Sequence, residues 1–478
     1  MKLNELIKQI DYEDACGDLD VEISGIATRA ESVCPGDAFV CYKGVNHDSH
    51  AFADRAAKNG AAAIICEREV ECSLPKVTVE DGRKAVTKLA RAFYGYADRQ
   101  LKLVAVTGTN GKTTTTYMLK SIFDKNASKT GIIGTLGIAY GDIFISPELT
   151  TPDPVFLHRV FRDMVNAGVE YVFMEVSAHA LYFDKIGGLH FEAGIFTNCT
   201  QDHLDFFKDM QSYAECKCKL FERGRCDIAI INSDDELGAS LCNGLPNVLS
   251  YGLDNPADTF AVNIKEEMSG SSFVINVSDE IFDVKLRLPA LHNVYNALAA
   301  ATCAHALGVN PETIAEGLFA LERVSGRLEK VASYKSAEIF VDFAHTPDGL
   351  EKSLLALKKL CKGKLYCMFG CGGNRDTAKR AVMGEIAAKI ADFVIITSDN
   401  PRFEDPYEII SQIESGVKKA GKNFVSITDR ESATEYAVNL LEKDDILLVA
   451  GKGGENYQEI MGIKHSYNDN TVIKKLIS

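Results

Sequence analysis

The segment 103–114 contains the residues whose types and spacing point most directly to chemistry. An apolar, β-branched run ends at Gly108, a second glycine follows at Gly111, and Lys-Thr-Thr comes next. A strand, a glycine-rich loop and a helix in this order are the context of a phosphate-binding loop. The loop amides and the helix N-terminus would face a polyphosphate, Lys112 would neutralise its β- and γ-phosphates, and the Thr113 hydroxyl would reach Mg2+.

A second group of polar residues follows two later apolar runs. Glu175 comes at the end of the run 171–174, and His203 follows the run 194–197 after a short loop. In open α/β sheets the ligand crevice lies at the carboxyl ends of the strands, so one crevice beside the loop could hold both side chains. A carboxylate and an imidazole there could serve as metal ligands, although Mg2+ prefers oxygen. The alternative is that each caps a helix or fills a loop.

A third group of loops stands near the C-terminus. Polar or glycine-rich loops at 344–348, 370–376, 398–402 and 451–455 each follow an apolar run. This pattern is typical of a doubly wound domain whose working loops share one edge. A nicotinamide-binding domain is excluded, because no strand is followed by Gly-x-Gly-x-x-Gly with an acidic residue about 20 positions on.

The elements that would position these residues form three α/β modules. We expect a small N-terminal domain at 1–97, a central P-loop domain with a mostly parallel sheet at 98–328, and a C-terminal Rossmann-like domain at 329–478. The predicted strands are the apolar runs 21–23, 25–26, 38–41, 62–66, 76–79, 103–106, 131–134, 171–176, 194–197, 227–231, 338–343, 364–369, 393–397, 423–427 and 445–450. Helical stretches such as 51–57 lie between them.

Composition narrows the class of protein. The 478 residues are 46% hydrophobic and 25% charged, as in ordinary globular proteins. A net charge of −15 argues against a general nucleic-acid binder. No apolar run is long enough to span a membrane and the N-terminus lacks a signal core, so we expect a cytoplasmic protein without membrane insertion. The 14 cysteines show no zinc spacing and are expected to be reduced thiols.

With these residues laid out, the whole chain resembles the Mur ligase family. The resemblance rests on eight motifs in the family's order: Thr-Gly-Thr-Asn-Gly-Lys-Thr-Thr (107–114), Thr-Thr-Pro-Asp (150–153), Glu-Val-Ser-Ala-His-Ala-Leu (175–181), Asp-His-Leu-Asp (202–205), Asn-Val-Tyr-Asn-Ala (293–297), Gly-Arg-Leu-Glu (326–329), Val-Asp-Phe-Ala-His-Thr-Pro-Asp (341–348) and Asp-Asn-Pro-Arg (399–402). It is closest to the branch that adds the third amino acid of the peptidoglycan peptide.

The resemblance implies an ATP-dependent, Mg2+-requiring amide ligase of peptidoglycan biosynthesis. Its substrates would be UDP-N-acetylmuramoyl-L-alanyl-D-glutamate and meso-diaminopimelate, and it would act as a monomer. ATP would phosphorylate the γ-carboxylate of D-glutamate, and the incoming amine would displace phosphate from the acyl phosphate. Phosphoryl activation is needed because a carboxylate and an amine do not condense unaided in water. Positioning and charge stabilisation would then supply much of the catalysis.

By the same resemblance, ATP lies between the central and C-terminal domains. Its contacts are Gly108, Thr109, Asn110, Gly111, Lys112, Thr113, Thr114, Asn293, Asn296, Arg327, Asp342 and His345. The catalytic residues would be Lys112, Glu175, His203 and Lys217. The metal contacts would be Thr113, Glu175, His203 and Lys217 as a carbamate. Lys217 is preferred over Lys219 because the family's spacing is Lys-x-x-Leu-Phe, and carbamylation converts a cation into an anionic oxygen ligand.

The resemblance also assigns the two remaining substrate sites. The residues expected to contact the UDP-sugar are Thr28, Val45, Asn46, His47, Thr150, Thr151, Ser177 and Lys185. The diaminopimelate side takes Arg375, Asp399, Asn400, Pro401, Arg402, Gly451 and Glu455. Arg402 can grip the second carboxylate of diaminopimelate through two N–H donors, and Glu455 is available to the far ammonium. The chain departs from the family at Thr28, Lys185 and Gly454, where Ser, Arg and His are usual.

Three alternatives remain open at this point. A lysine-adding ligase of the same branch would differ mainly at position 402. A folylpolyglutamate synthase has a similar P-loop but lacks the Asp-Asn-Pro-Arg loop and a uridine-type N-terminal domain. A non-catalytic ATP-binding homologue would not be expected to keep Lys112, Glu175, His203 and Lys217.

Overall fold

The α/β class expected from the sequence is confirmed in a computed structural model of the chain, which describes residues 1–44, 47–146 and 148–478. The chain divides into two compact units. The first contains residues 1–107, 127–194 and 216–229, and the second contains residues 108–126, 195–215 and 230–478. The predicted domain boundaries at 97/98 and 328/329 stay predictions.

The N-terminal part of the first unit is a small sheet between two helical layers. Its strand order is β1-β5-β4-β3-β2, with β1 antiparallel and the other pairs parallel. The elements are α1 (Leu3–Leu6), β1 (Asp14–Cys16), β2 (Gly25–Ala27), β3 (Asp37–Val40), α2 (Ala53–Lys58), β4 (Ala63–Cys66), β5 (Lys76–Thr78) and α3 (Gly82–Phe93), with 3-10 turns at Ile7–Gln9, Ala30–Ser32, Ser49–Phe52 and Ala97–Gln100.

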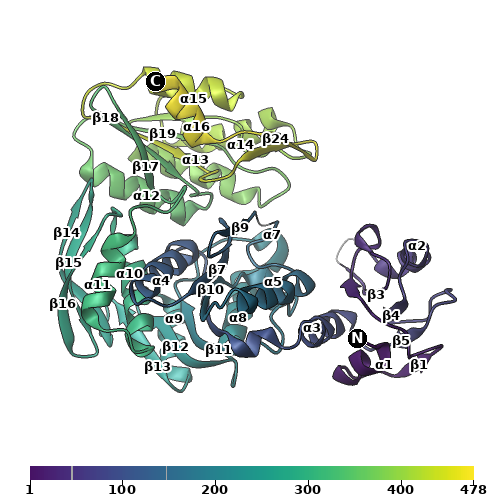
Figure 1. The fold of residues 1–478 in the computed structure, drawn as a ribbon. Helices are drawn as coiled ribbons and strands as arrows, with labels where there is room; N and C mark the ends of the chain where they lie inside the picture. Colours follow the sequence, from purple (N-terminus) through teal and green to yellow (C-terminus); the bar gives the residue numbers. More distant parts are fainter. Residues whose placement is uncertain (45–46, 147) are drawn as a thin grey trace. The chain divides into compact units, whose positions relative to one another are not determined.

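Alternation along β3 explains the two layers. Ala38 and Val40 pack with α1 and α3, whereas Phe39 packs with α2 on the opposite face. Figure 1 shows α1 and α2 on opposite sides of this sheet. The predicted strand at 21–23 is wrong: this segment makes only an isolated bridge between Lys2 and Glu22. The predicted helix at 51–57 begins as a 3-10 turn and becomes α2 at Ala53.

The rest of the first unit contains strands in the order β6-β10-β7-β8-β9, all largely buried except β9. The pairs β6–β10 and β10–β7 are parallel, and β7, β8 and β9 form an antiparallel meander. The elements are β6 (Lys102–Thr107), β7 (Thr130–Gly134), β8 (Gly137–Tyr140), β9 (Ile143–Ile145), α5 (Pro154–Asn166), β10 (Tyr171–Glu175), α6 (Ala178–Tyr182) and a 3-10 turn at Lys219–Phe221. Three elements have residues in both units: β11 (Phe191–Phe196), α8 (Met210–Cys218) and β12 (Cys226–Asn232).

The second unit begins with the P-loop helix. This helix, α4 (Lys112–Lys125), packs against α10 (Leu291–Ala306) and α11 (Pro311–Ala320). An antiparallel ribbon lies beside α10 and α11 (Figure 1) and comprises β14 (Thr259–Glu267), β15 (Gly270–Val277) and β16 (Glu280–Leu286), with β13 (Val248–Gly252) pairing parallel to β14. The short helices α7 (Leu204–Phe207) and α9 (Glu236–Gly244) belong to the same unit.

The C-terminal part of the second unit is a doubly wound sheet in the order β17-β18-β22-β19-β20-β21. Only the β17–β18 pair is antiparallel. The strands are β17 (Glu329–Tyr334), β18 (Ala337–Asp342), β19 (Leu365–Phe369), β20 (Phe393–Ile396), β21 (Phe424–Ser426) and β22 (Ile446–Ala450), followed by the hairpin β23 (Tyr457–Ile460) and β24 (Ile463–Ser466). The helices are α12 (Pro347–Leu360), α13 (Ala378–Ile390), α14 (Pro406–Lys419), α15 (Arg430–Asn439) and α16 (Asp469–Ile477).

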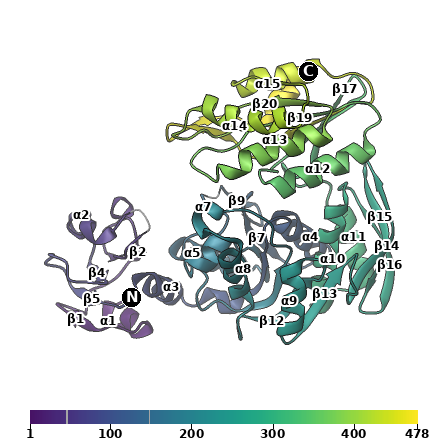
Figure 2. The same ribbon diagram turned by 180° about the vertical axis from the view of Figure 1, so that it is seen from behind.

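Residues alternate between the two faces of this sheet and create two cores. Phe340 joins the core under α12, α13 and α14, and its neighbours Ile339 and Val341 join the core under α15 and α16. Figure 2 shows α13 and α15 on opposite sides of the sheet. Because the strands are parallel, the predicted loops at 344–348, 370–376, 398–402 and 451–455 follow β18, β19, β20 and β22 at one edge.

The fourteen cysteines all lie within the described ranges, and none of them is joined in a disulfide there. Among the described helices, none combines the length and apolar character that crossing a bilayer requires.

Candidate functional site

The phosphate-binding loop follows β6 and is shaped by two glycines with positive φ. Gly108 has φ +146°, and a Cβ there would overlap the Thr197 hydroxyl, so no other residue fits. Gly111 has φ +89° and precedes the first residue of α4. The backbone N–H of Asn110 donates to the Asn198 side chain over 2.9 Å, and the Thr197 hydroxyl donates to the Asn110 backbone carbonyl over 2.6 Å. Hydrogen bonds with the segment 197–198 therefore fix the conformation of the loop where it enters the helix.

The two side chains expected to act on the phosphates belong to Lys112 and Thr113, the first two residues of α4. The Lys112 ammonium donates to the carbonyls of Gly108 and Thr109 at 2.7 and 2.8 Å. Thr113 is buried, and its hydroxyl accepts a 2.9 Å hydrogen bond from Arg327. The Arg327 guanidinium also lies 4.5 Å from the centre of the Phe343 ring. The linker residue Arg327 is thus in direct contact with the P-loop helix.

The loop also contacts the first turn of α12. The side-chain amide of Asn110 donates to Asp348 Oδ2 over 2.8 Å, and the Thr200 hydroxyl donates to the same oxygen over 3.4 Å. Lys352, one turn along the helix, lies 2.9 Å from the other oxygen of Asp348. The structure therefore joins the P-loop, the 198–200 segment and the motif at 341–348 through one carboxylate.

Three further residues expected at the nucleotide are buried close by. Asn296 accepts from the Thr115 hydroxyl of α4 over 3.4 Å and donates to Asn293 over 3.2 Å. Asn293 in turn donates to the Pro289 carbonyl over 2.6 Å. Asp342 ends β18 and accepts a short hydrogen bond from Ser353. These side chains fix α10 against α4 and β18 against α12.

His203 and His345 converge on the carboxylate of Asp202, which was assigned no role from the sequence. Their Nε2 atoms lie 3.4 and 3.7 Å from Asp202 Oδ2. Burial opposes ionisation of Asp202, but His345 and His203 hold the pKa of this carboxyl well below its usual range. His203 has φ +57°, a strained conformation for a residue with a side chain and one that clusters at functional sites. Asp202 thus orients both imidazoles.

In the first unit, Glu175 accepts hydrogen bonds from two threonines, and these link it to further hydroxyl groups. Its carboxylate accepts from the Thr135 amide over 2.8 Å and from the Thr135 hydroxyl over 3.0 Å. That hydroxyl lies 3.1 Å from the Thr150 hydroxyl. Thr151 donates to the Glu175 carbonyl over 2.9 Å, and the Ser177 amide donates to Thr151 over 3.0 Å. The structure thus brings together four expected residues from two separate motifs.

Of the remaining UDP-side residues, Thr28 lies close to Tyr42 and Lys185 lies close to Asp153. Burial together with the nearby Asp153 carboxylate raises the pKa of Tyr42. Lys185 pairs with Asp153 at 2.7 Å. His47 is exposed, and Val45 and Asn46 lie outside the described residues.

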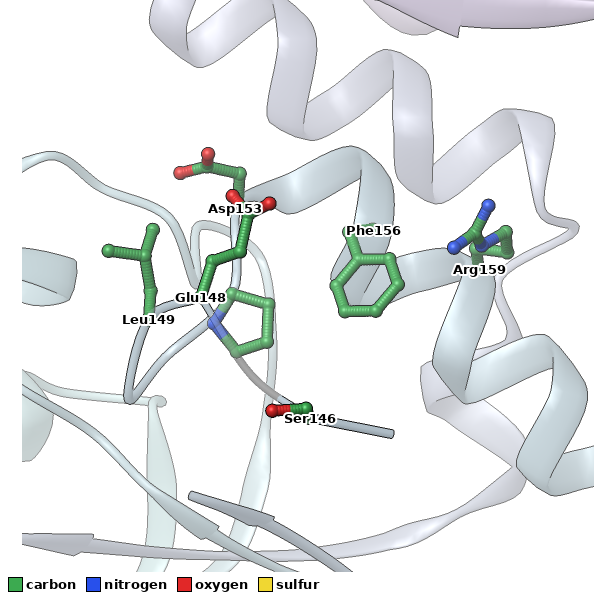
Figure 3. A pocket seen from close by; sticks show the side chains of 7 residues that line it. Ser146, Glu148, Leu149, Asp153, Phe156 and Arg159 are labelled. Atoms are coloured by element: carbon green, nitrogen blue, oxygen red, sulfur yellow. The ribbon is translucent and has the colours of Figure 1, made fainter. Parts of the chain in front are cut away.

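A cavity of about 330 Å³ opens beside Thr150 and Thr151. Figure 3 shows the side chains that line it, which are Ser146, Glu148, Leu149, Pro152, Asp153, Phe156 and Arg159. The Arg159 guanidinium lies 4.8 Å from the Phe156 ring centre. The cavity therefore offers a cation and a ring face next to the Thr-Thr-Pro-Asp motif.

In the second unit, Arg402 is held on two sides. Its Nη1 donates to the Gly373 carbonyl over 2.7 Å and its Nε lies 3.3 Å from Glu459. Its own backbone has φ +54° and bonds to Glu459 and Met461 of the β23–β24 hairpin. The guanidinium position is thus set before any ligand binds, in a strained conformation of the kind that clusters at ligand sites.

The other residues expected at this pocket surround Arg402. A Cβ placed on Gly372 would lie 2.9 Å from Arg402 Nη1, 3.8 Å from Arg375 and 3.9 Å from the Asn400 carbonyl. Asn400 donates to Glu455 over 2.9 Å. A Cβ placed on Gly451 would meet the Asp399 carboxylate. Pro401 follows Asn400, whose carbonyl accepts from the Gly373 amide over 2.9 Å. The structure therefore gathers this whole expected set.

Several of the residues expected at Mg2+ are buried. Thr113 and Glu175 offer buried oxygen donors, and Lys217 near the end of α8 is 1% exposed. Within 1–44, 47–146 and 148–478, no three His, Cys, Asp or Glu side chains group as a metal site. The oxygen donors fit Mg2+.

Sequence reasoning missed Asp202, Asp348, Thr135 and Lys452 as site residues. Asp202 and Asp348 both lie within motifs of the family. Asp202 directly precedes His203, and Asp348 lies in a loop that follows a predicted strand, and these positions were the signals that the sequence offered. Thr135 and Lys452 were not singled out, because their partners are fixed only by the tertiary fold.

Three family models match successive parts of the chain. A model described as the Mur ligase family, catalytic domain, matches residues 22–94. The Mur ligase middle domain matches residues 106–304, and the Mur ligase, glutamate ligase domain, matches residues 326–453. This division agrees with the three-domain α/β architecture expected from the sequence.

Relatives and solved structures cover the whole chain. The UDP-N-acetylmuramoyl-L-alanyl-D-glutamate–2,6-diaminopimelate ligase 1 of Clostridium acetobutylicum is 42% identical over 475 residues, which are 98% of this chain and 97% of that protein. The solved structure of a UDP-N-acetylmuramoyl-L-alanyl-D-glutamate–2,6-diaminopimelate ligase matches this chain with a TM-score of 0.71 and 29% identity. The match covers 100% of this chain and 98% of that one. The MurF ligase of Thermotoga maritima, solved with ADP, shares the fold at a TM-score of 0.65 and 21% identity, covering 97% and 98%.

Proposed function

Because the chain belongs to the Mur ligase family, we propose that it joins meso-diaminopimelate to the D-glutamate of UDP-N-acetylmuramoyl-L-alanyl-D-glutamate, with cleavage of ATP. The product would be the tripeptide precursor of peptidoglycan. The 42% identical relative carries this activity in its name, over nearly the full length of both chains.

The observation that carries the proposal is the pocket around Arg402. A guanidinium fixed by Gly373 and Glu459 stands beside Asn400 and Glu455. Diaminopimelate differs from lysine by a carboxylate at its far end, and a guanidinium binds a carboxylate through two parallel N–H donors. The far ammonium of the same substrate requires an anionic partner, which Glu455 supplies.

In the first step, an oxygen of the γ-carboxylate of D-glutamate attacks the γ-phosphorus of ATP. The bond between that phosphorus and the β,γ-bridging oxygen breaks, ADP leaves, and an acyl phosphate forms. The amides of the P-loop and the Lys112 ammonium bind the phosphates and stabilise the charge that develops on them. Arg327, which contacts Thr113, and Asp348, which contacts Asn110, hold the loop against the C-terminal part of the same unit.

In the second step, the neutral amine of diaminopimelate attacks the acyl carbon. A tetrahedral intermediate forms, phosphate leaves with the C–O bond electrons, and the amine loses a proton to give the amide. Arg402 and Glu455 contribute by holding the far end of the amino acid, which makes attack effectively intramolecular.

The Mg2+ ion would be held by Thr113, Glu175, His203 and a carbamate on Lys217, and when bound it neutralises phosphate charge. The burial of Lys217 supports this assignment. Its neutral amine would add CO2 and release a proton, which replaces a buried cation with a carbamate anion whose charge a bound Mg2+ would balance. We place the reaction in the cytoplasm, where ATP is available, and expect the chain to act as a monomer.

The test is release of phosphate from ATP with purified protein. We expect release only when both UDP-N-acetylmuramoyl-L-alanyl-D-glutamate and meso-diaminopimelate are present, with the tripeptide product identified by mass spectrometry. Lysine in place of diaminopimelate should give little product. Efficient use of lysine would instead indicate the lysine-adding branch, use of a folate substrate would indicate the synthase, and ATP binding without turnover would contradict any ligase activity.

A further inference from the structure

Lys452 is a buried cation between Asn400 and Glu455, two residues of the proposed amino-acid pocket. Its side chain is fully buried, and its ammonium donates to Asn400 Oδ1 over 3.0 Å and to Glu455 Oε2 over 2.9 Å. It also lies 3.9 Å from the Asp399 carboxylate. An ammonium out of water is costly unless it is paired and hydrogen-bonded, so these contacts must form whenever the loop is folded.

This ammonium also determines which way the Asn400 amide points. A lysine ammonium can only donate, so the oxygen of the amide must face Lys452. The same oxygen accepts from the Glu459 amide over 2.9 Å. The Asn400 nitrogen is consequently directed to Glu455, over 2.9 Å. Lys452, Asn400 and Glu455 therefore form a closed triangle in which each member fixes the other two.

We propose that Lys452 is the positioning residue of the amino-acid pocket and sets its preference for a substrate with a second carboxylate. It acts through Asn400 and Glu455 without touching the amino acid. This inference rests on the proposed function, since it concerns how the same pocket selects its substrate.

The charges around the pocket explain the preference. Lys452 pairs with Glu455 and lies near Asp399, and Arg402 lies near Glu459. Loss of Lys452 removes the cation that pairs with Glu455 and makes the net charge of the pocket more negative by one. The added negative charge repels the second carboxylate of diaminopimelate and leaves lysine, which has only a cation at that end, less affected. Loss of Lys452 should therefore weaken discrimination as well as binding.

The experiment compares Lys452→Met with the matched control Lys464→Met. Lys464 is exposed on the β23–β24 hairpin, and both ammonium groups lie near the ring of Tyr457, at 5.6 Å for Lys452 and 4.5 Å for Lys464. In K452M we expect the KM for diaminopimelate to rise about 10-fold, with the KM for ATP within about 2-fold of the wild type. The ratio of kcat/KM for diaminopimelate to that for lysine should fall about 5-fold or more. K464M should change none of these values.

A milder variant keeps the proposal testable if K452M does not fold. Lys452→Gln keeps an amide donor for one of the two acceptors, and we expect an intermediate, selective rise in the KM for diaminopimelate. Folding of each variant is checked by thermal unfolding in the absence of ligands. A folded variant whose diaminopimelate KM and amino-acid preference are unchanged would overturn the proposal, and so would an equal loss for ATP and diaminopimelate. Failure of the wild type to use either amino acid would instead refute the proposed function.

Discussion

The side-chain amide of Asn110, in the P-loop, donates a 2.8 Å hydrogen bond to the carboxylate of Asp348, in the first turn of α12. The two residues are 238 positions apart in the chain. Asp348 also accepts from Thr200 and pairs with Lys352, so one carboxylate unites three segments. Because a P-loop binds phosphate through its backbone, its shape depends on the side chains that hold it.

We therefore predict that Asp348→Ala raises the KM for ATP about 5- to 10-fold and lowers the free energy of unfolding by about 1–2 kcal/mol, because Asn110 and Thr200 lose their acceptor. Initial rates at varied ATP and urea unfolding would measure the two effects. Glu351→Ala is the matched control, since Glu351 is an exposed carboxylate on the same helix. An unchanged KM for ATP in D348A would show that the contact does not shape the loop.

Lys217 and Lys219 provide a direct comparison between a buried and a more accessible lysine. Lys217 is 1% exposed, whereas Lys219 is partly exposed and lies 5.9 Å from the Tyr182 ring centre. If Lys217 supplies a carbamate oxygen to the metal, Lys217→Ala should lower kcat by about 100-fold or more, as loss of one electrostatic contact to a reacting group does. Lys219→Ala should stay within about 3-fold of the wild type on the same reasoning. Equal activity of the two variants in the phosphate-release assay would contradict the assignment.

His158, within α5, makes the stability of the first unit depend on pH. Its ring is fully buried, neither ring nitrogen has a hydrogen-bond partner among the described residues, and Asp98 Oδ1 lies 3.9 Å away. Burial lowers the pKa of His158 to about 4, against the opposing effect of Asp98 and with a smaller contribution from Arg91. In the unfolded chain the pKa returns to about 6.5, so the unfolded state binds the extra proton first as the pH falls.

The stabilising contribution of neutral His158 is thus complete above about pH 6.5 and is lost as the pH falls toward 4. We predict that wild-type protein loses roughly 2–3 kcal/mol more stability than His158→Phe between pH 7 and pH 4.5. Phenylalanine suits the site because the ring already packs edge-on against Phe161 at 5.7 Å. Urea unfolding at several pH values would measure the difference, and parallel pH profiles for the two proteins would rule out this titration.

The parallel strands could be predicted from the sequence because each is a short, continuously buried apolar run. The runs at 171–176, 364–369 and 445–450 match β10, β19 and β22 to within a residue or two. The ribbon β14–β16 was missed because one of its faces is exposed: Phe260 and Val262 lie among polar residues in β14, which reads as a loop in the sequence. Pattern reasoning detects a strand buried on both faces better than one buried on a single face.

The site was predictable where the chemistry resides in a residue type within a motif, as for Lys112, Glu175 and Arg402. It was not predictable where function depends on a contact between distant segments. Lys452 reaches Asn400 across 52 positions of the chain, and Asp348 reaches Asn110 across 238, and no local spacing encodes these two pairs. The sequence therefore indicates the groups that would meet the substrates, whereas the groups that orient them emerge only from the fold.

Arg402 allows the amino-acid preference to be tested separately from ATP chemistry. The Arg402 Nη1 donates to the Gly373 carbonyl, and its Nε lies near the Glu459 carboxylate. The side chain is still 21% exposed. Lysine in its place would keep the charge but lose the planar pair of donors that matches a carboxylate. We predict that Arg402→Lys raises the KM for diaminopimelate about 10-fold and Arg402→Ala about 100-fold, with the KM for ATP within about 2-fold in both. Initial rates at varied diaminopimelate and varied ATP would measure both constants. Arg402→Ala should affect lysine addition little, because lysine has no second carboxylate to lose. Equal losses for ATP and diaminopimelate would mean that Arg402 supports the fold of the loop and does not select the substrate.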